Sequence, residues 1–213
     1  MITKRIMLHC MIYGSLSRSP YHSDISPDLC YRRADVAVAA SFQFELAAVR
    51  TKLIQAQAKP ALARPTDLFE PTHVFSSGLQ RCVQLVHALS DRPATFDQRL
   101  LEINFGQWQS QTWPQIPPDQ MQAWERDPLH YVPPGGESAY QMGQRVALFA
   151  EELKQLDDSV KVLIVSHGGP IYMLVATLLD APLSVAMNLR VDYDSVTRLD
   201  RRAGRQRLIC LKH

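Results

Sequence analysis

The chain has 213 residues, of which 46% are hydrophobic and 21% charged, and its formal net charge at pH 7 is +2. This length suits one α/β domain with a single sizeable core, and the composition excludes an intrinsically disordered chain. Because the net charge is close to zero, it gives no argument for a nucleic-acid partner or an acidic membrane surface, and we expect neither.

The four cysteines and the N-terminal segment bear on the cellular compartment. No two cysteines form a C-x-x-C pair, and the neighbours His9 and Cys10 would point to opposite faces of an extended strand. We therefore expect reduced thiols and no metal site built on these cysteines. No apolar run reaches the roughly 18 residues that span a bilayer, and residues 1–13 lack a signal-peptide cleavage site. The sequence thus predicts a cytoplasmic protein.

Strands and helices alternate along the first half of the chain. Residues 5–9 form a short apolar run typical of a buried strand, and the Ser-, Pro- and Tyr-rich stretch 14–29 is typical of a loop. Apolar residues at three- and four-residue spacing then predict a helix over 41–59. A strand over 72–75 and a helix over 79–89 follow.

The pattern weakens over 91–138, which contains all three tryptophans and two Pro-Pro pairs. This segment is expected to be an inserted cap with at most a short helix over 119–125. The elements expected beyond it are a helix over 138–156, a strand over 160–166, a helix over 168–179, and strands over 194–199 and 206–211. Strands that alternate with helices predict a single α/β domain over residues 1–213, a three-layer α/β/α sandwich without internal repeats.

A histidine follows the most continuously apolar strand, within Ser166-His167-Gly168-Gly169. Open α/β sheets bind ligands at the carboxyl ends of such buried strands. The two glycines allow the backbone to approach a ligand closely, and the next helix begins with free N–H groups. This arrangement suits a dianionic phosphate. The alternative is a strand-to-helix turn with an incidental histidine.

Two further residues are candidates for the same chemistry. Arg81 lies in the first turn of a helix that follows a strand and the small residues Ser76-Ser77, and an arginine there can bind two phosphate oxygens at once. Glu102 lies alone among apolar and aromatic residues, and desolvation raises the pKa of a carboxyl group, which suits a general acid. The alternatives are a surface arginine and a solvated loop glutamate.

In this order the motifs resemble the histidine phosphatase (phosphoglycerate mutase-like) superfamily over about residues 28–199, and within it the α-ribazole phosphatase group. Ser166-His167-Gly168-Gly169 is similar to a motif of the whole superfamily. The likeness to the subgroup rests on Leu29-Cys30-Tyr31 with Asp35-Val36, Ser76-Ser77-x-Leu79-x-Arg81-Cys82, Glu102-Ile103-Asn104-Phe105-Gly106-Gln107-Trp108, Ile116-Pro117, Trp124, Asp127-Pro128 and Pro133-Pro134-Gly135-Gly136-Glu137-Ser138.

The resemblance implies a two-step hydrolysis of a phosphomonoester. By position, His9 is the nucleophile that becomes phosphorylated, and Arg81 and His167 hold the phosphoryl oxygens. Glu102 protonates the leaving alkoxide, and water then releases phosphate.

The resemblance also assigns further residues and partners. Gly168 and Glu137 join Arg81 as phosphate- or substrate-binding residues, and no metal or cofactor is implied. The expected partner is a small phosphorylated metabolite such as α-ribazole 5′-phosphate, an intermediate of cobalamin biosynthesis. A homodimer is left open.

The sequence departs from the family pattern around its first strand. Leu8 stands where the family has an arginine, and residues 14–28 form an apparent insertion. Losing a charged donor from such a site costs about a hundred- to a thousand-fold in rate. A substitute from Arg18, Arg32 or Arg33 is one hypothesis, and a structural role for His9 is another.

Two function classes therefore remain: a phosphatase, and a catalytically impaired relative that binds a phosphorylated ligand or a protein partner. Phosphoglycerate mutase activity is less favoured because residues 133–138 match the cobalamin-type group.

Overall fold

The computed structural model describes residues 4–10, 30, 33–35, 42–56, 70–187, 196–202 and 205–212. The strands are β1 (Lys4–Cys10), β2 (His73–Ser76), β3 (Thr95–Phe96), β4 (Lys161–Ser166), β5 (Val196–Arg202) and β6 (Arg205–Lys212). The helices are α1 (Phe42–Gln55), α2 (Gln80–Leu89), α3 (Pro118–Arg126), α4 (Ala139–Gln155), α5 (Gly168–Leu178) and α6 (Leu183–Ala186), and short 3₁₀ turns lie at Gln98–Leu100, Gly106–Trp108 and Trp113–Gln115.

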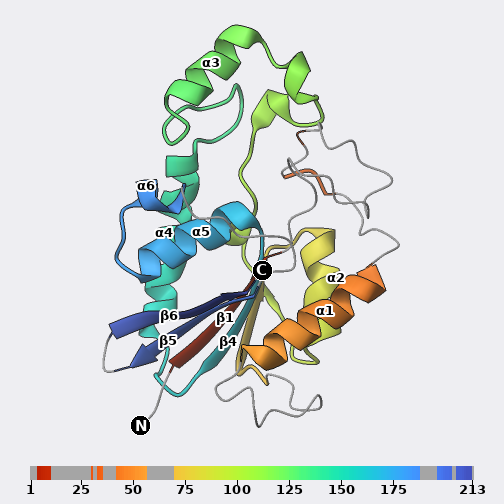
Figure 1. Cartoon of the computed structure of the whole chain (residues 1–213), viewed down its shortest axis with the longest axis vertical. Helices are drawn as coiled ribbons and strands as arrows, with labels where there is room; N and C mark the ends of the chain where they lie inside the picture. Colours follow the sequence, from red (N-terminus) through yellow and green to blue (C-terminus); the bar gives the residue numbers. More distant parts are fainter. Residues whose placement is uncertain are drawn as a thin grey trace.

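The described strands form one sheet in the order β3-β2-β4-β1-β5-β6 (Figure 1). β4 pairs in parallel with β1 and β2, β3 extends the parallel part, and β5 and β6 are antiparallel additions. The register places His9 opposite Val165 and Cys10 opposite Ser166. Because parallel strands end at the same edge of a sheet, the ends of β1 and β4 adjoin in its centre.

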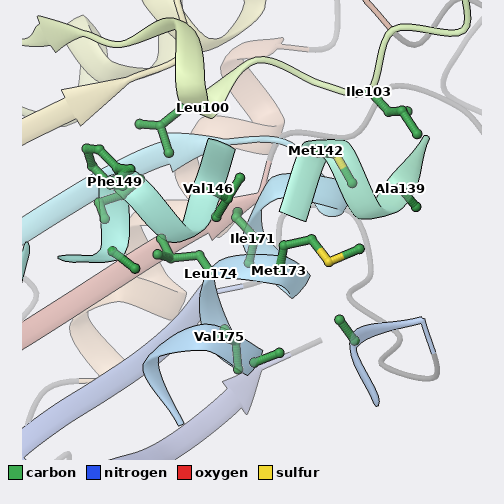
Figure 2. Packing of buried hydrophobic residues seen from close by; sticks show 14 of the residues in the cluster. Leu100, Ile103, Ala139, Met142, Val146, Phe149, Ile171, Met173, Leu174 and Val175 are labelled. Atoms are coloured by element: carbon green, nitrogen blue, oxygen red, sulfur yellow. The ribbon is translucent and has the colours of Figure 1, made fainter. Parts of the chain in front are cut away.

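Helices cover both faces of the sheet, and alternate residues of β4 show why. Val162 and Ile164 belong to a core shared with α4 and α5, whereas Leu163 and Val165 belong to a core shared with α1 and α2. Successive side chains of a strand point to opposite faces, so a strand buried on both sides must be apolar throughout. Figure 2 shows α4 and α5 packed together through residues such as Val146 and Ile171. The three-layer α/β/α prediction is confirmed.

Helix α3 stands at the top of Figure 1, beyond the end of the sheet where β1 and β4 finish. No residue of this helix is fully buried, and stacked aromatic rings attach it to the rest of the segment. Trp124 stacks on Trp113 with ring centroids 6.1 Å apart, and the buried Trp108 stacks on Tyr131 at 5.5 Å. The Trp108 indole N–H also donates to Gln120 at 2.8 Å.

Two glycines bring the backbone of residues 104–106 against that of residues 133–136. Gly106 has a φ of +55°, and a Cβ there would overlap the carbonyl oxygen of Pro134. A Cβ at Gly136 would overlap the carbonyl oxygen of Asn104. Two backbone hydrogen bonds join these segments: the Gln107 N–H donates to the carbonyl oxygen of Pro134, and the Glu137 N–H donates to that of Asn104, both at 2.8 Å. This close approach fixes the loop that follows Glu102.

The strands and helices expected from the sequence are confirmed within one residue at most ends, except that α1 ends four residues earlier than expected and β5 ends three residues later. Strand β3, helix α6 and the 3₁₀ turns were not expected. The expected loop over 14–29 and the expected first two residues of the strand over 194–199 lie outside the described residues. Among the described residues, no helix has the length and apolar character needed to cross a membrane.

We predict that Gly106→Ala lowers the free energy of unfolding by about 2 kcal/mol or more, because a left-handed backbone and an atomic overlap act together. Chemical denaturation measures this loss. Gly135, at φ +71° with open space around it, separates the two causes, since Gly135→Ala adds strain without overlap. Gly78→Ala is the control with open space and no positive φ, and it should change stability by less than about 0.5 kcal/mol. Equal losses in the three variants would contradict the packing argument.

Candidate active site

His167 lies at the junction between β4 and α5. Its backbone is extended, with φ −115° and ψ 167°, and it occupies the N-cap position of α5. The hydroxyl of the preceding Ser166 donates to the carbonyl oxygen of Leu100 at 2.7 Å and so anchors the end of β4. His167 is only 1% exposed, and it emerges at the carboxyl edge of the sheet where the sequence placed it.

Arg81 and Ser77 contact the His167 ring from the neighbouring β2–α2 connection. The Ser77 N–H donates to the carbonyl oxygen of Val165 at 3.1 Å, which attaches this connection to β4. The Ser77 hydroxyl lies 2.7 Å from Nε2 of His167, and Nη2 of Arg81 lies 3.2 Å from Nδ1. Arg81 is 1% exposed and also donates to the carbonyl oxygen of Ala34 at 2.9 Å. The expectation of a merely surface arginine is excluded.

These contacts determine which nitrogen of His167 carries the proton. A guanidinium group has only donors, so the nitrogen that faces Arg81 must be an acceptor, and Nδ1 is unprotonated. The imidazole is then neutral and carries its proton on Nε2, which donates to the Ser77 hydroxyl. In this tautomer the single N–H of His167 donates to the Ser77 hydroxyl, so an anion would have to replace that hydroxyl to accept from the ring.

Glu102 is the carboxylate next to this pair. It is 3% exposed, and its Oε1 accepts a hydrogen bond from the Ile103 N–H at 2.9 Å. An added Cβ at Gly169 would come 2.5 Å from the same oxygen, so Glu102 lies against the first turn of α5. The structure thus brings Glu102, Gly169, His167 and Arg81 to one edge of the sheet, as the sequence predicts. The catalytic and binding roles of these residues, and of Gly168, stay predictions.

Glu137 is paired with Arg145 of α4 and contacts the backbone just after Glu102. Its Oε1 is 2.7 Å from Nη2 of Arg145, and the same oxygen accepts a hydrogen bond from the Asn104 N–H at 3.0 Å. The substrate-binding role expected of Glu137 stays a prediction, but these partners describe its position. Arg145 carries no signal of this role in the sequence.

His9 is placed only by the backbone of β1. It lies opposite Val165 in the register, two residues before His167 along β4, and Leu8 lies opposite Ile164. Both positions are at the edge where the other site residues gather. The side chains of β1 lie outside the described residues, as do Arg18 and Arg32, so the nucleophile and the substitute arginine stay predictions.

Three residues near the site were not predicted to act there. Asp35 accepts a hydrogen bond from the Gln80 N–H at 2.7 Å and so caps the first turn of α2, whose own N-cap position holds Leu79. Ser77 was expected only as a small turn residue. Cys82 lies on α2 with its Sγ 3.6 Å from Nε2 of His167. Asp35 stood within a family-like motif and Leu79 cannot cap α2, but neither observation assigned a capping role to Asp35.

The thiol of Cys82 is unreactive in the folded protein. Burial raises the pKa of its thiol from 9.0 to about 12, although a hydrogen bond with Ser77 and the charge of Arg81 act in the opposite direction. A thiol with such a pKa is not a nucleophile at neutral pH. Among the described residues, no group of three or more His, Cys, Asp or Glu side chains could hold a metal ion.

Comparisons with known proteins agree with this geometry. A sequence model of the histidine phosphatase superfamily (branch 1) matches residues 52–213, a range that includes Arg81, Glu102 and His167 but not His9. A glucosyl-3-phosphoglycerate phosphatase of Mycolicibacterium vanbaalenii is 35% identical over 127 residues, which are 54% of this chain and 56% of that protein.

Two further relatives are α-ribazole phosphatases. The adenosylcobalamin/alpha-ribazole phosphatase of Escherichia coli is 29% identical over 140 residues, which are 60% of this chain and 69% of that protein. The crystal structure of the alpha-ribazole phosphatase from Shigella flexneri superposes with a TM-score of 0.75 at 25% identity, covering 97% of this chain and 95% of that one. The two sequence matches thus span little more than half to about two thirds of the relatives' length.

The tautomer of His167 can be tested by ¹⁵N NMR of histidine-labelled protein. We expect a neutral ring protonated at Nε2 in the wild type, because Arg81 occupies Nδ1. Arg81→Met should remove this preference, whereas His87→Ala, on the exposed side of α2, should leave the His167 signals unchanged. A proton on Nδ1 in the wild type would refute the assigned contact.

The thiol of Cys82 makes stability depend on alkaline pH. Its pKa is higher in the folded state than in the unfolded state, so its contribution is fully present below pH 9.0 and is lost as pH rises towards 12. We expect the wild type to lose up to about 1.4 kcal/mol more than Cys82→Ala for each pH unit above 9. Denaturation curves of both proteins on either side of pH 9 measure the difference, and parallel losses would contradict the prediction.

Proposed function

The chain belongs to the histidine phosphatase superfamily (branch 1), and on this premise we propose that it hydrolyses phosphomonoesters through a phosphohistidine intermediate. The observation that carries the proposal is the buried contact of Arg81 and Ser77 with His167. A guanidinium and a neutral imidazole N–H are both suited to phosphoryl oxygens, and burial strengthens their interaction with a dianion. The register of β1 supports His9 as the nucleophile beside them.

The proposed reaction has two steps. An imidazole nitrogen of His9 attacks phosphorus, the bond from phosphorus to the ester oxygen breaks, and Glu102 gives its proton to the departing alkoxide. Glu102, now ionised, takes a proton from water, the water oxygen attacks phosphorus, and the bond between phosphorus and His9 breaks. Inorganic phosphate leaves, and both residues return to their starting states. Arg81 and His167 hold the equatorial oxygens in both steps.

The proposed substrate is a small phosphorylated metabolite, with α-ribazole 5′-phosphate as the first candidate. The motifs at Ile116-Pro117 and residues 133–138, and the likeness to two α-ribazole phosphatases, support this choice. The mycobacterial relative supports a competing choice, glucosyl-3-phosphoglycerate. Both are phosphate monoesters of an alcohol, so both need a proton donor for the leaving oxygen.

The second candidate function is binding of a phosphorylated ligand or partner without turnover. The observation that favours it is Leu8, which occupies the position where the family has a phosphate-binding arginine. The superfamily match also begins at residue 52 and leaves β1 outside. The Arg81–His167 contact would still bind phosphate in such a protein.

Turnover of α-ribazole 5′-phosphate, glucosyl-3-phosphoglycerate and p-nitrophenyl phosphate tests both functions. We expect the wild type to hydrolyse at least one of them, and His167→Ala and Arg81→Gln each to lower kcat/KM by about a hundred-fold or more, because each removes one donor from the phosphoryl group. His9→Ala should abolish turnover and the acid-labile phosphoprotein seen on rapid quenching. His87→Ala is the matched histidine control and should retain wild-type rates.

Substitution at Leu8 separates the two functions. If the wild type shows no turnover but Leu8→Arg gains it, the native protein is not a phosphatase and the binding function stands. If the wild type turns over and His9→Ala does not, the binding-only function falls.

A further inference from the structure

We propose that Arg145, together with Glu137, is a positioning residue that sets the place of Glu102 relative to the phosphate site. This inference rests on the proposed function, because it concerns the residues that hold Glu102, the proposed general acid, in place. Arg145 lies on α4 and is 18% exposed in its side chain, and Glu137 precedes the same helix and is 17% exposed. A charged pair that is so little exposed needs hydrogen-bond partners. The partners that the structure gives are the two side chains themselves and backbone groups of residues 99–104.

Arg145 contacts the backbone of the segment that carries Glu102. Its Nη1 donates to the carbonyl oxygen of Arg99 at 2.7 Å, and its Nη2 donates to the carbonyl oxygen of Glu102 itself at 3.2 Å. A planar guanidinium fork can hold two carbonyl groups in a fixed relation, which a lysine cannot.

Glu137 completes the support on the other side of Glu102. Its two carboxylate oxygens accept from Nη2 and Nε of Arg145 at 2.7 and 3.0 Å, and its Oε1 also accepts from the Asn104 N–H at 3.0 Å. Its own N–H donates to the carbonyl oxygen of Asn104 at 2.8 Å. The pair therefore holds backbone groups both before and after Glu102.

The support has a chemical consequence because Glu102 has little freedom of its own. Its Oε1 lies between the Ile103 N–H and the first turn of α5, where a Cβ on Gly169 would come within 2.5 Å. A shift of about 1 Å in the backbone of Glu102 would move the carboxyl group away from the leaving oxygen, and such a displacement can cost a hundred-fold in rate. The phosphate-binding contacts of Arg81 and His167 come from other segments and would remain.

The leaving group reveals whether the acid is misplaced. An alkyl phosphate needs a proton donor, whereas p-nitrophenolate leaves well without one. We expect both Arg145→Gln and Glu102→Gln to lower kcat on the best alkyl substrate by about a hundred-fold, and to lower turnover of p-nitrophenyl phosphate less than about five-fold. KM should change little, and Arg145→Lys should restore part of the rate.

Two variants serve as comparisons. Arg92→Gln is the matched control, because Arg92 is an exposed arginine between α2 and β3, outside the segment that Arg145 contacts. It should leave the ratio of the two substrates unchanged. Glu137→Gln should change the ratio in the same direction as Arg145→Gln. If instead it raises KM alone on the alkyl substrate, Glu137 binds substrate and the proposal is overturned.

Amide hydrogen exchange keeps the proposal testable if the proposed function fails. Should the wild type hydrolyse neither class of substrate, the phosphatase function falls, and exchange at Ile103 and Asn104 then decides the positioning role. We expect Arg145→Gln to speed exchange at these two residues at least ten-fold, with no change at Val165 in β4. Unchanged exchange, or an equal loss on both substrate classes, would overturn the proposal.

Discussion

The site depends on the burial of one guanidinium group. Arg81 is almost fully enclosed, and a buried charge is tolerated only when its donors have partners. Two of these are the carbonyl oxygen of Ala34 and Nδ1 of His167, which come from segments more than 45 residues away on either side. Arg81 can therefore be buried only after α2, the end of β4 and the segment around Ala34 have come together.

Described residues close to Ala34 in the sequence contact both α2 and the segment that follows Glu102. Asp35 caps α2 one residue before Arg81, and the backbone of Cys30 exchanges hydrogen bonds with Ser110 and Gln111 at 2.8 Å. Cys30 thus contacts the loop beside the aromatic cluster of Trp108, and Ala34 and Asp35 contact the helix that carries Arg81.

Much of the fold was predictable because its elements are long and strongly patterned. The near-continuous apolar run of β4 predicts a strand buried on both faces, and the glycines after His167 indicate a ligand site at its carboxyl end. Strand β3 has two residues, too few to show a period of two, and it was missed. Arg81, Glu102 and His167 were predicted to share one site because their motifs follow the order found in the family, since no local pattern links these three residues.

The contacts of Arg145 and Asp35 could not be predicted, and the reason is physical. Arg145 on an amphipathic helix has the pattern of a solvated charge, yet its partners are carbonyl groups 43 and 46 residues away. Asp35 supplies a helix cap from 45 residues away. Side chains that satisfy distant backbone groups leave no periodic signal, because the backbone carbonyl is the same at every residue.

The site divides into two parts that can be separated physically. One part comprises Arg81, Ser77 and His167, and its contacts to one another are made by the β2–α2 connection and the end of β4. The other part is β1, which brings His9 and Leu8 to the same edge by its register with β4. The hydrogen bonds among these three residues involve no residue of β1. In the proposed function, Arg81 and His167 bind the phosphate, whereas phosphoryl transfer also needs the nucleophile His9 on β1.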